Sequence, residues 1–483
     1  MRWTRFRFIG AAALPLLLFG CVHMDVLAPR TSPSPQTPFS PPPDVMPPPV
    51  ETPAFQRPPG FPESKKLWSL ADLVDIGLFN NMQTRMAWSA ARSAAAALGA
   101  VRGAFFPRLA VDVNALKTKS SAVIGQILVF DYSSLTPIAS LSWQLLDFGG
   151  RSGLTEEARD ALAAANWTQN SVIQNVILLI EQNYYQYVAA KALLAAQETS
   201  RGEAEKNLEA AEARRRAGVA TLADTLQAKT VVSRIQLDII TTQGLIQTLK
   251  GVLADSLGMP ANAEFDIAAD LPETLPVNDA GGSVERRIAE ALARRPDLAA
   301  SRALALKAAA HIGAVRAQGL PTLNFTGSYG RVFYSTPAQA NSFSAALVLD
   351  IPLFRGFSVA YQALQAEMDA ETMRAQVRKS ELDVGLQVWT SYFGVQTAAQ
   401  RIRTAQDLLN LAQQSYDVAS GSYKEGVSSI LDLLAAQSAL ENGRVQLVQA
   451  KAQWLLSLVQ FARDSGMLDS PGGATARTEK GER

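Results

Sequence analysis

Cysteine and histidine are nearly absent from this chain. Its 483 residues include one cysteine, Cys21, and two histidines, His23 and His311. A single thiol cannot form a disulfide within the chain, and a zinc site built from histidine and cysteine needs three or four such ligands. A disulfide framework is therefore excluded, a His/Cys metal centre nearly so, and we expect the protein to work without a cofactor.

The chain also has no large excess of positive or negative charge. The 45 lysines and arginines are balanced by 44 aspartates and glutamates, which leaves a net charge of +1. No global field would therefore attract nucleic acid or an anionic surface. Beyond Leu67 no apolar run has the length and purity of a transmembrane helix, which needs about 20 residues. The remainder of the chain is either soluble or crosses a membrane as strands.

The beginning of the chain, in contrast, has the pattern of an export signal. Three arginines within residues 1–7 precede an apolar stretch over residues 8–19, which is too short to span a bilayer comfortably. It ends in Leu-Phe-Gly-Cys, which resembles the cleavage box of bacterial lipoproteins. We expect residues 1–20 to be a signal peptide and Cys21 to carry lipid, with sorting to the outer membrane because no aspartate follows. The alternative is an ordinary secretory signal that contains a cysteine.

Proline is concentrated in residues 29–62 and missing from residues 150–218. Proline-dense chain cannot donate backbone hydrogen bonds and favours extended polyproline conformations. We therefore interpret residues 21–66 as a tether between the lipid anchor and the folded body. The proline-free segment is predicted to form one helix of about 100 Å, at about 1.5 Å per residue, which no compact globular domain accommodates.

The chain contains an internal duplication. The matching segments are 98–102 with 312–316, 145–150 with 351–356, and 217–219 with 425–427. In both copies an aspartate, Asp224 or Asp432, follows six residues after a glycine. Because order and spacing repeat together, we predict two structural repeats, over 67–281 and 282–469, with a disordered tail over 470–483.

Each repeat is predicted to contain a helix, two strands, a very long helix, a glycine turn and a second long helix. Apolar and polar residues alternate from Leu109, Ser140, Leu323 and Phe343 onward. Such alternation over about ten residues is typical of membrane barrel strands. A half-buried soluble sheet alternates too, but four symmetrically placed strands in an exported chain favour the barrel.

The returning helices carry a seven-residue repeat. In the second half its positions are Leu433, Leu440, Leu447, Trp454 and Phe461, and small residues follow the first four at Ala436, Gly443, Ala450 and Ser457. The first half keeps the same phase at Thr225, Val232, Ile239, Ile246 and Leu253. Sustained heptads predict coiled-coil packing, and small seam residues allow helices to approach closely. A soluble antiparallel coiled coil is the plain alternative, but it does not explain the inserted strands.

With this layout the sequence resembles the TolC family of outer-membrane efflux proteins. The resemblance covers residues 67–467 and rests on the duplication, on the strand-ending segment 145–150, and on segment 423–432 with its tyrosine, glycine turn and aspartate. It implies a mixed α and membrane-β fold: a homotrimer whose protomers give four strands each to one 12-stranded β-barrel. A long α-helical coiled-coil tunnel would continue the barrel into the periplasm.

The resemblance also implies which residues carry the function. The tips at Gly218, Val219, Gly426 and Val427 would contact a periplasmic membrane-fusion adaptor, and Asp432, Asp224 and Tyr423 would belong to a periplasmic gate. A threefold axis would turn each aspartate into a ring of carboxylates, whose repulsion raises their pKa and whose charge attracts cations.

Three departures from the family pattern concern this gate and the anchor. Ala435 stands where the best-known members have a second aspartate, and Ser428 stands where an arginine links neighbouring hairpins. The Gly-Pro-Asp-Tyr run that follows the cysteine in many lipidated relatives is absent. The gate ring is therefore expected to be single, and its closing network different.

Other motifs that suggest catalysis lack the accompanying residues that the chemistry would need. Asp147-Phe148-Gly149 spells a kinase magnesium motif, but no phosphate loop accompanies it, so we interpret it as a strand end. His311 is interpreted as a polar or interface residue. Arg214 and its two neighbouring arginines are interpreted most simply as a solvated face at a helix C-terminus, with contact to a partner as the alternative. The sequence thus favours a passive exit duct fed by an inner-membrane pump. The alternatives are the exit duct of a type I protein secretion system and a non-conducting envelope scaffold.

Overall fold

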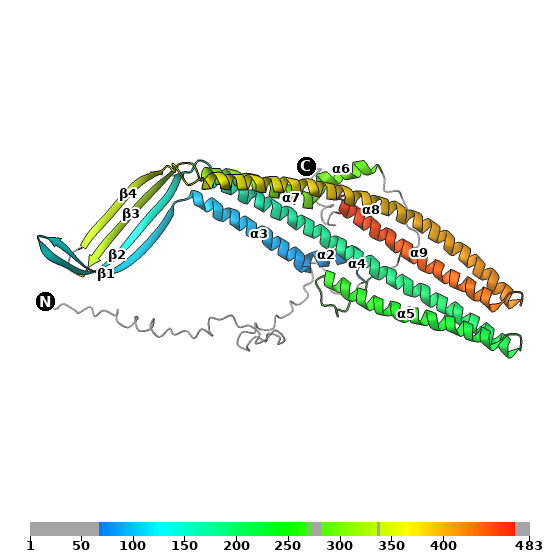
Figure 1. The fold of residues 1–483 in the computed structure, drawn as a ribbon. Coiled ribbons are helices and arrows are strands. Elements are labelled where there is room, and N and C mark those ends of the chain that lie inside the picture. Colours follow the sequence, from blue (N-terminus) through cyan, green and yellow to red (C-terminus); the bar gives the residue numbers. More distant parts are fainter. Residues whose placement is uncertain (1–66, 268–270, 272–281, 336–338, 469–483) are drawn as a thin grey trace, which may run out of the picture. The chain divides into compact units, whose positions relative to one another are not determined.

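The computed structural model describes residues 67–267, 271, 282–335 and 339–468, and of 122–124, 126–128 and 130 it describes the backbone alone. Figure 1 shows the arrangement of helices and strands. The predicted signal peptide, the lipidation site Cys21, the tether and the 470–483 tail lie outside the described residues and stay predictions. The repeat boundaries at 281 and 469 stay predictions too.

The predicted duplication is confirmed at the level of whole elements. The first repeat contains α3 (Met82–Arg102), β1 (Arg108–Ile124), β2 (Gln126–Leu146), α4 (Gly150–Arg216) and α5 (Leu222–Ser256). The second contains α7 (Pro296–Ala317), β3 (Thr322–Tyr334), β4 (Gln339–Asp350), α8 (Ser358–Lys424) and α9 (Ile430–Asp464). The long helices α4 and α8 have 67 residues each, and α5 and α9 have 35 each. Short helices α2 (Leu70–Asn80) and α6 (Val284–Arg294) and the 3-10 turn η2 (Gly103–Phe105) complete the described elements.

The four strands form one antiparallel sheet in the order β1-β2-β3-β4. The second hairpin has the expected length, with strands of 13 and 12 residues, but β1 and β2 have 17 and 21. Clear alternation stops near Val113, so the sequence pattern underestimates the first hairpin. Backbone pairing instead continues to Ile124 and Gln126 and turns at Gly125, whose φ of +73° suits glycine.

A tight strand-to-helix turn follows β2. Phe148 and Gly149 have left-handed φ values of 50° and 105°, and the Asp147 carboxylate accepts a hydrogen bond of 2.6 Å from the Arg151 backbone N–H. The Arg151 guanidinium in turn donates to the Gln144 carbonyl at 2.6 Å. The Asp-Phe-Gly run is therefore a strand end, as the sequence indicates.

The helices pack through the predicted heptads. On α9, Leu433, Leu440, Trp454 and Phe461 are buried. A Cβ atom on Gly443 would lie 3.2 Å from the Leu409 Cα of α8, so the small residue sets the helix separation. A second core forms where α2 packs against α4 and α5, around Leu73, Ile76, Ile180, Leu253 and Leu257.

Helix α7 corrects one expectation. By length and composition it could cross a membrane, the one described helix that could, although the sequence suggested none. Its alanines instead give it close contact with neighbouring helices: a Cβ atom on Gly153 of α4 would lie 2.8 Å from the Ala314 backbone nitrogen. His311 of α7 faces Glu157 of α4, with 2.8 Å between imidazole Nδ1 and carboxylate, which agrees with an interface residue.

Candidate functional site: the hairpin tips and the seam between them

Both long helices end in the same hydrogen-bonded turn. The Val219 N–H donates to the Arg214 carbonyl at 3.0 Å, and the Val427 N–H donates to the Ser422 carbonyl at 2.8 Å. The intervening glycines, Gly218 and Gly426, have φ values of +76° and +81°. This six-to-one bond over a left-handed glycine is a Schellman cap. It leaves the side chains of Val219 and Val427 64% and 83% exposed at the two tips.

The two predicted gate aspartates begin the returning helices. Asp224 accepts the Thr221 N–H at 2.8 Å, while Asp432 accepts the Ser429 N–H at 3.1 Å and its hydroxyl at 2.7 Å. Each pair is a capping box, with the hydroxyl oxygen accepting the aspartate N–H in return. The sequence contains the signal, a hydroxyl residue three positions before an acid, but the aspartates were interpreted as gate residues only.

Capping also affects the charge of Asp432, which is exposed. The Ser429 side chain and then its backbone N–H donate to the carboxylate, and they hold the pKa of Asp432 below its usual value. Hydrogen bonds to a carboxylate favour its charged form. In a single chain the residue is therefore ionised at neutral pH. The upward shift expected from a ring needs three chains and stays a prediction.

Tyr423 is buried beneath the first repeat rather than exposed at the tip. Its side chain is 4% exposed and packs with Ala211, Ala228 and Leu433. The Arg214 guanidinium lies 4.8 Å from the ring centroid and donates to the Tyr423 carbonyl. Arg214 is thus a contact between repeats, and its interpretation as a solvated face was wrong, because isolated arginine runs do not reveal a partner 209 positions away.

Burial raises the pKa of the Tyr423 phenol, which Arg214 opposes and Asp224 reinforces. Among the described residues its hydroxyl has no hydrogen-bond partner. The tyrosine is therefore neutral at physiological pH and acts here through its ring. Of the three predicted gate residues, Asp224 and Asp432 cap α5 and α9, while Tyr423 packs in the apolar cluster between the two hairpins.

Further from the tips, polar side chains join α4 and α5 to α9. We call these residues the polar seam: Glu203, Asn207, Arg234, Gln437, Glu441 and Arg444. Both guanidinium nitrogens of Arg444 donate to the Glu203 carboxylate at 2.7 Å. Arg234 pairs with Glu441 at 2.5 Å, and Asn207 donates to Gln437 at 2.8 Å. The sequence heptads suggested an apolar contact, so the polar seam was missed.

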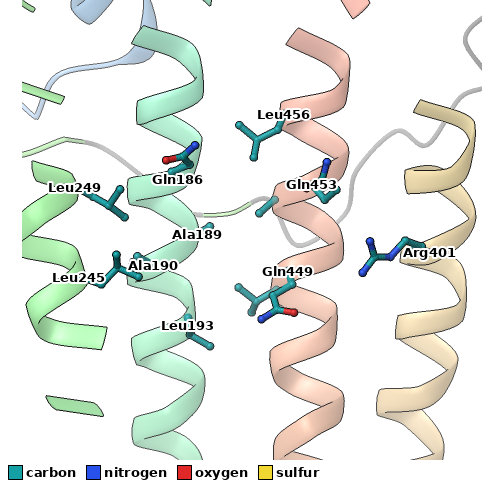
Figure 2. A pocket seen from close by; sticks show the side chains of 12 residues that line it. Gln186, Ala189, Ala190, Leu193, Leu245, Leu249, Arg401, Gln449, Gln453 and Leu456 are labelled. Atoms are coloured by element: carbon teal, nitrogen blue, oxygen red, sulfur yellow. The ribbon is translucent and has the colours of Figure 1, made fainter. Parts of the chain in front are cut away.

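A groove of about 440 Å³ lies beside the polar seam, between α4, α5, α8 and α9 (Figure 2). Leu193, Leu245, Leu249 and Leu456 give it apolar walls, and Gln186, Gln449, Gln453 and Arg401 supply its polar groups. Figure 2 shows Arg401 reaching it from α8, across from the leucines of α5. Over the part of the chain that is described, no cluster of histidine, cysteine and acidic residues is placed to hold a metal.

The two repeats are also found when the sequence is compared with known protein families. The sequence profile described as "Outer membrane efflux protein" matches residues 73–259 and 288–466, one segment in each repeat. The chain belongs to this family. The outer membrane efflux protein described here is accordingly an exit duct at the outer membrane for an efflux system, and the barrel-and-tunnel fold implied by the resemblance is confirmed.

Individual relatives of this outer membrane efflux protein are distant but match over most of their length. Protein CyaE of Bordetella pertussis is 24% identical and covers 80% of this chain and 81% of its own. The probable efflux pump outer membrane protein TtgC of Pseudomonas putida is 24% identical, with 82% and 83% covered. The crystal structure of VceC from Vibrio cholerae matches with a TM-score of 0.72 at 20% identity, over 82% of this chain and 96% of that one.

Proposed function

We propose that three copies of this chain close one barrel and form a passive conduit, fed by an inner-membrane pump through a periplasmic adaptor. The observation that carries the proposal is the pair of open sheet edges. In the described sheet, β1 and β4 each pair on one side only. An unpaired edge cannot face lipid, where no water satisfies its backbone groups. Four strands are too few to close alone, since the smallest barrels have about eight.

The two faces of the sheet support a lipid-facing exterior and a wet interior. The strand register puts large apolar residues on one face: Leu109, Val111, Val113, Leu141, Phe325, Phe343, Leu347 and Leu349. All but Leu141 and Phe325 are exposed. Asp112, Asn114, Ser328 and Ser344 lie on the other, where the two serine hydroxyls are 2.9 Å apart. Apolar-out and polar-in alternation is the pattern of a membrane barrel around an aqueous lumen.

The helices support the same assembly. On α5, Leu237 and Ile240 are exposed, and on α8 Leu411 and Val418 are exposed. The repeat partners of these two helices, α9 and α4, pack against each other within the chain. A second copy would let α8 of one protomer cover α5 of the next, which continues the same helix packing around a closed ring.

Mass measurement and conductance test this proposal together. Purified full-length protein in mild detergent should have the mass of a trimer, and it should conduct ions when inserted into a planar bilayer. A monomeric mass with intact helical circular dichroism would contradict the barrel. A trimer that never conducts would instead favour the non-conducting scaffold.

The exposed valines support adaptor docking at the tips. Val219 and Val427 lie just past equivalent turns in the two repeats, so one protomer offers two similar apolar knobs. Isolated apolar side chains at the end of a helical hairpin are suited to the groove of another helical hairpin. We expect the adaptor to contact Gly218, Val219, Gly426 and Val427.

Asp432 supports a charged ring at the periplasmic end. Its carboxylate is exposed, and Ser429 keeps it ionised, so three copies around one axis would present three negative charges. Such a ring attracts cations. Asp224 is partly covered, so we expect the weaker effect there. Cys21 is proposed as the lipid anchor in the outer membrane.

A further inference from the structure

The groove beside the polar seam lies on the side of the long helices that faces away from α2 and α6. Helix α2 packs on α4 around Val176 and Ile180, and α6 packs on α8 around Val388. Ala189, which lines the groove, follows Ile180 by nine residues, which is about two and a half turns at about 3.6 residues per turn. Arg401 follows Val388 by thirteen residues, about three and a half turns. Both side chains therefore leave their helices on the side opposite to α2 and α6.

In a closed duct this side of the helices faces the lumen, a step that rests on the proposed trimeric conduit. The long helices α4, α5, α8 and α9 of three chains, set about 8–10 Å apart in one ring, leave an opening roughly 25 Å wide between their surfaces. A helix with its side chains is about 10–12 Å thick, so α2 and α6 of three chains would fill that opening. A ring that conducts keeps them on its outer side, and the groove then opens to the transport path.

The groove combines apolar walls with one cation that no carboxylate neutralises. Leu193, Leu245 and Leu249 stand on α4 and α5, while Arg401 is exposed on α8, and Figure 2 shows its guanidinium turned toward α9. Within the described part of the chain Arg401 forms no ion pair and no side-chain hydrogen bond. No aspartate or glutamate lines the groove. The planar donors of a free guanidinium match the oxygens of an organic acid.

We propose that this groove is a transit site for small organic anions with an apolar body, such as aromatic sulfonates or carboxylates. Its volume of about 440 Å³ lies within the range of about 300–1,000 Å³ that small-molecule sites occupy. The leucines would cover the apolar body, and Arg401 would donate hydrogen bonds to the acidic group. A site on a transport path also has to release its ligand, and an open groove with a single charged contact is suited to brief binding.

The aspartates near the tips do not cancel the charge of Arg401. This residue lies 23 positions before the end of α8 at Lys424, about 35 Å at about 1.5 Å per residue. The Debye length at physiological salt is about 8 Å, so the field of Asp432 is screened over that distance. An anion that has passed the tips therefore meets an attractive charge at the groove.

Block of single channels by 2-naphthalenesulfonate tests the site. The probe is added on the periplasmic side of full-length protein in a planar bilayer, and the concentration that halves the mean current is measured at one fixed voltage. Arg401→Gln should raise this concentration about tenfold, because the charge-assisted contact is lost. Arg403→Gln is the matched control: it removes the same charge from an exposed residue on the other side of α8 and should leave the block unchanged. Leu245→Gln, in an apolar wall where the side chain is 46% exposed, should weaken the block as well.

The outcomes separate the groove from the conduit. A parent protein that never conducts would overturn the proposed function itself, whereas a parent that conducts but is not blocked by the probe would overturn the groove alone. Unchanged block in Arg401→Gln would also overturn the site, and so would equal losses in Arg401→Gln and Arg403→Gln, which would indicate a general effect of charge. 2-Naphthylmethylammonium has the same rings and the opposite charge, and its block should not weaken in Arg401→Gln; a tenfold loss there would contradict recognition of an anion.

Discussion

The ion pair between Glu203 and Arg444 offers a direct measure of how strongly the two hairpins of one chain are joined. Their side chains are 22% and 16% exposed and share two hydrogen bonds of 2.7 Å. Fully exposed pairs contribute about 0.2–1 kcal/mol, and hydrogen bonds to charged groups about 1.5–3 kcal/mol. Arg444→Met leaves the Glu203 carboxylate, whose side chain is mostly covered, without its cation. We expect a loss of about 2 kcal/mol per chain.

Heating in mild detergent, with helical circular dichroism as the signal and one fixed scan rate, measures this loss. Arg444→Met and Glu203→Gln should each lower the apparent Tm by a few degrees. The charge swap, Glu203→Arg with Arg444→Glu, should recover at least half of the loss because the bidentate geometry can form in reverse. Arg374→Met removes an exposed pair with Glu371 on α8, at 59% and 63% exposure, and serves as the control.

Two outcomes would refute the reasoning. If Arg444→Met melts like the Arg374→Met control, the pair contributes no more than a solvated one. If the charge swap lowers the apparent Tm by the sum of the two single decreases, the loss comes from packing of the long side chains rather than from their pairing.

Four further outcomes are expected. Cys21→Ser should abolish incorporation of a radioactive fatty acid; equal labelling of variant and parent would exclude the anchor. Val219→Trp with Val427→Trp should stop export while trimers still form, and loss of trimers would make the valines structural. Asp432→Asn should weaken cation selectivity and block by multivalent cations in single-channel recordings, with unchanged selectivity placing the residue off the axis. Gly443→Leu should cost about 1–3 kcal/mol per chain in the same melting assay, because a Cβ atom there already lies 3.2 Å from the Leu409 Cα.

The helical framework could be predicted from the sequence because its signals are local and long. Proline-free residues 150–218 and the heptads from Leu433 to Phe461 predicted α4 and α9 closely, and repeated glycines located both tips. A repeat of 208 residues also strengthens weak signals, since a pattern that occurs twice is less easily due to chance. The four strands were found in this way, although each alone was ambiguous.

Side-chain partners across the repeats could not be predicted. Arg214 and Tyr423 are 209 residues apart, and neither carries a local sign of the other. The full length of the β1–β2 hairpin was missed for another reason: once alternation ended at Val113, an apolar run with a central glycine gave no period to follow. Asp432 is a third case. The family resemblance implied a role in the pore, but Ser429 and Asp432 also have the spacing of a capping box, which was not predicted.

The polar seam has a consequence for how such a duct could widen. Positions 208 residues from Glu203 and Arg444 are Leu411 and Gln236, so the equivalent seam between neighbouring chains would lack the ion pair. A trimer would then contain six similar hairpins but two kinds of boundary, three held by charge and three by uncharged side chains. Separation at the uncharged boundaries costs less, which makes the whole chain, a pair of hairpins, the unit of movement. The helix packing of the tunnel would be close to sixfold symmetric, whereas its movement would be threefold symmetric.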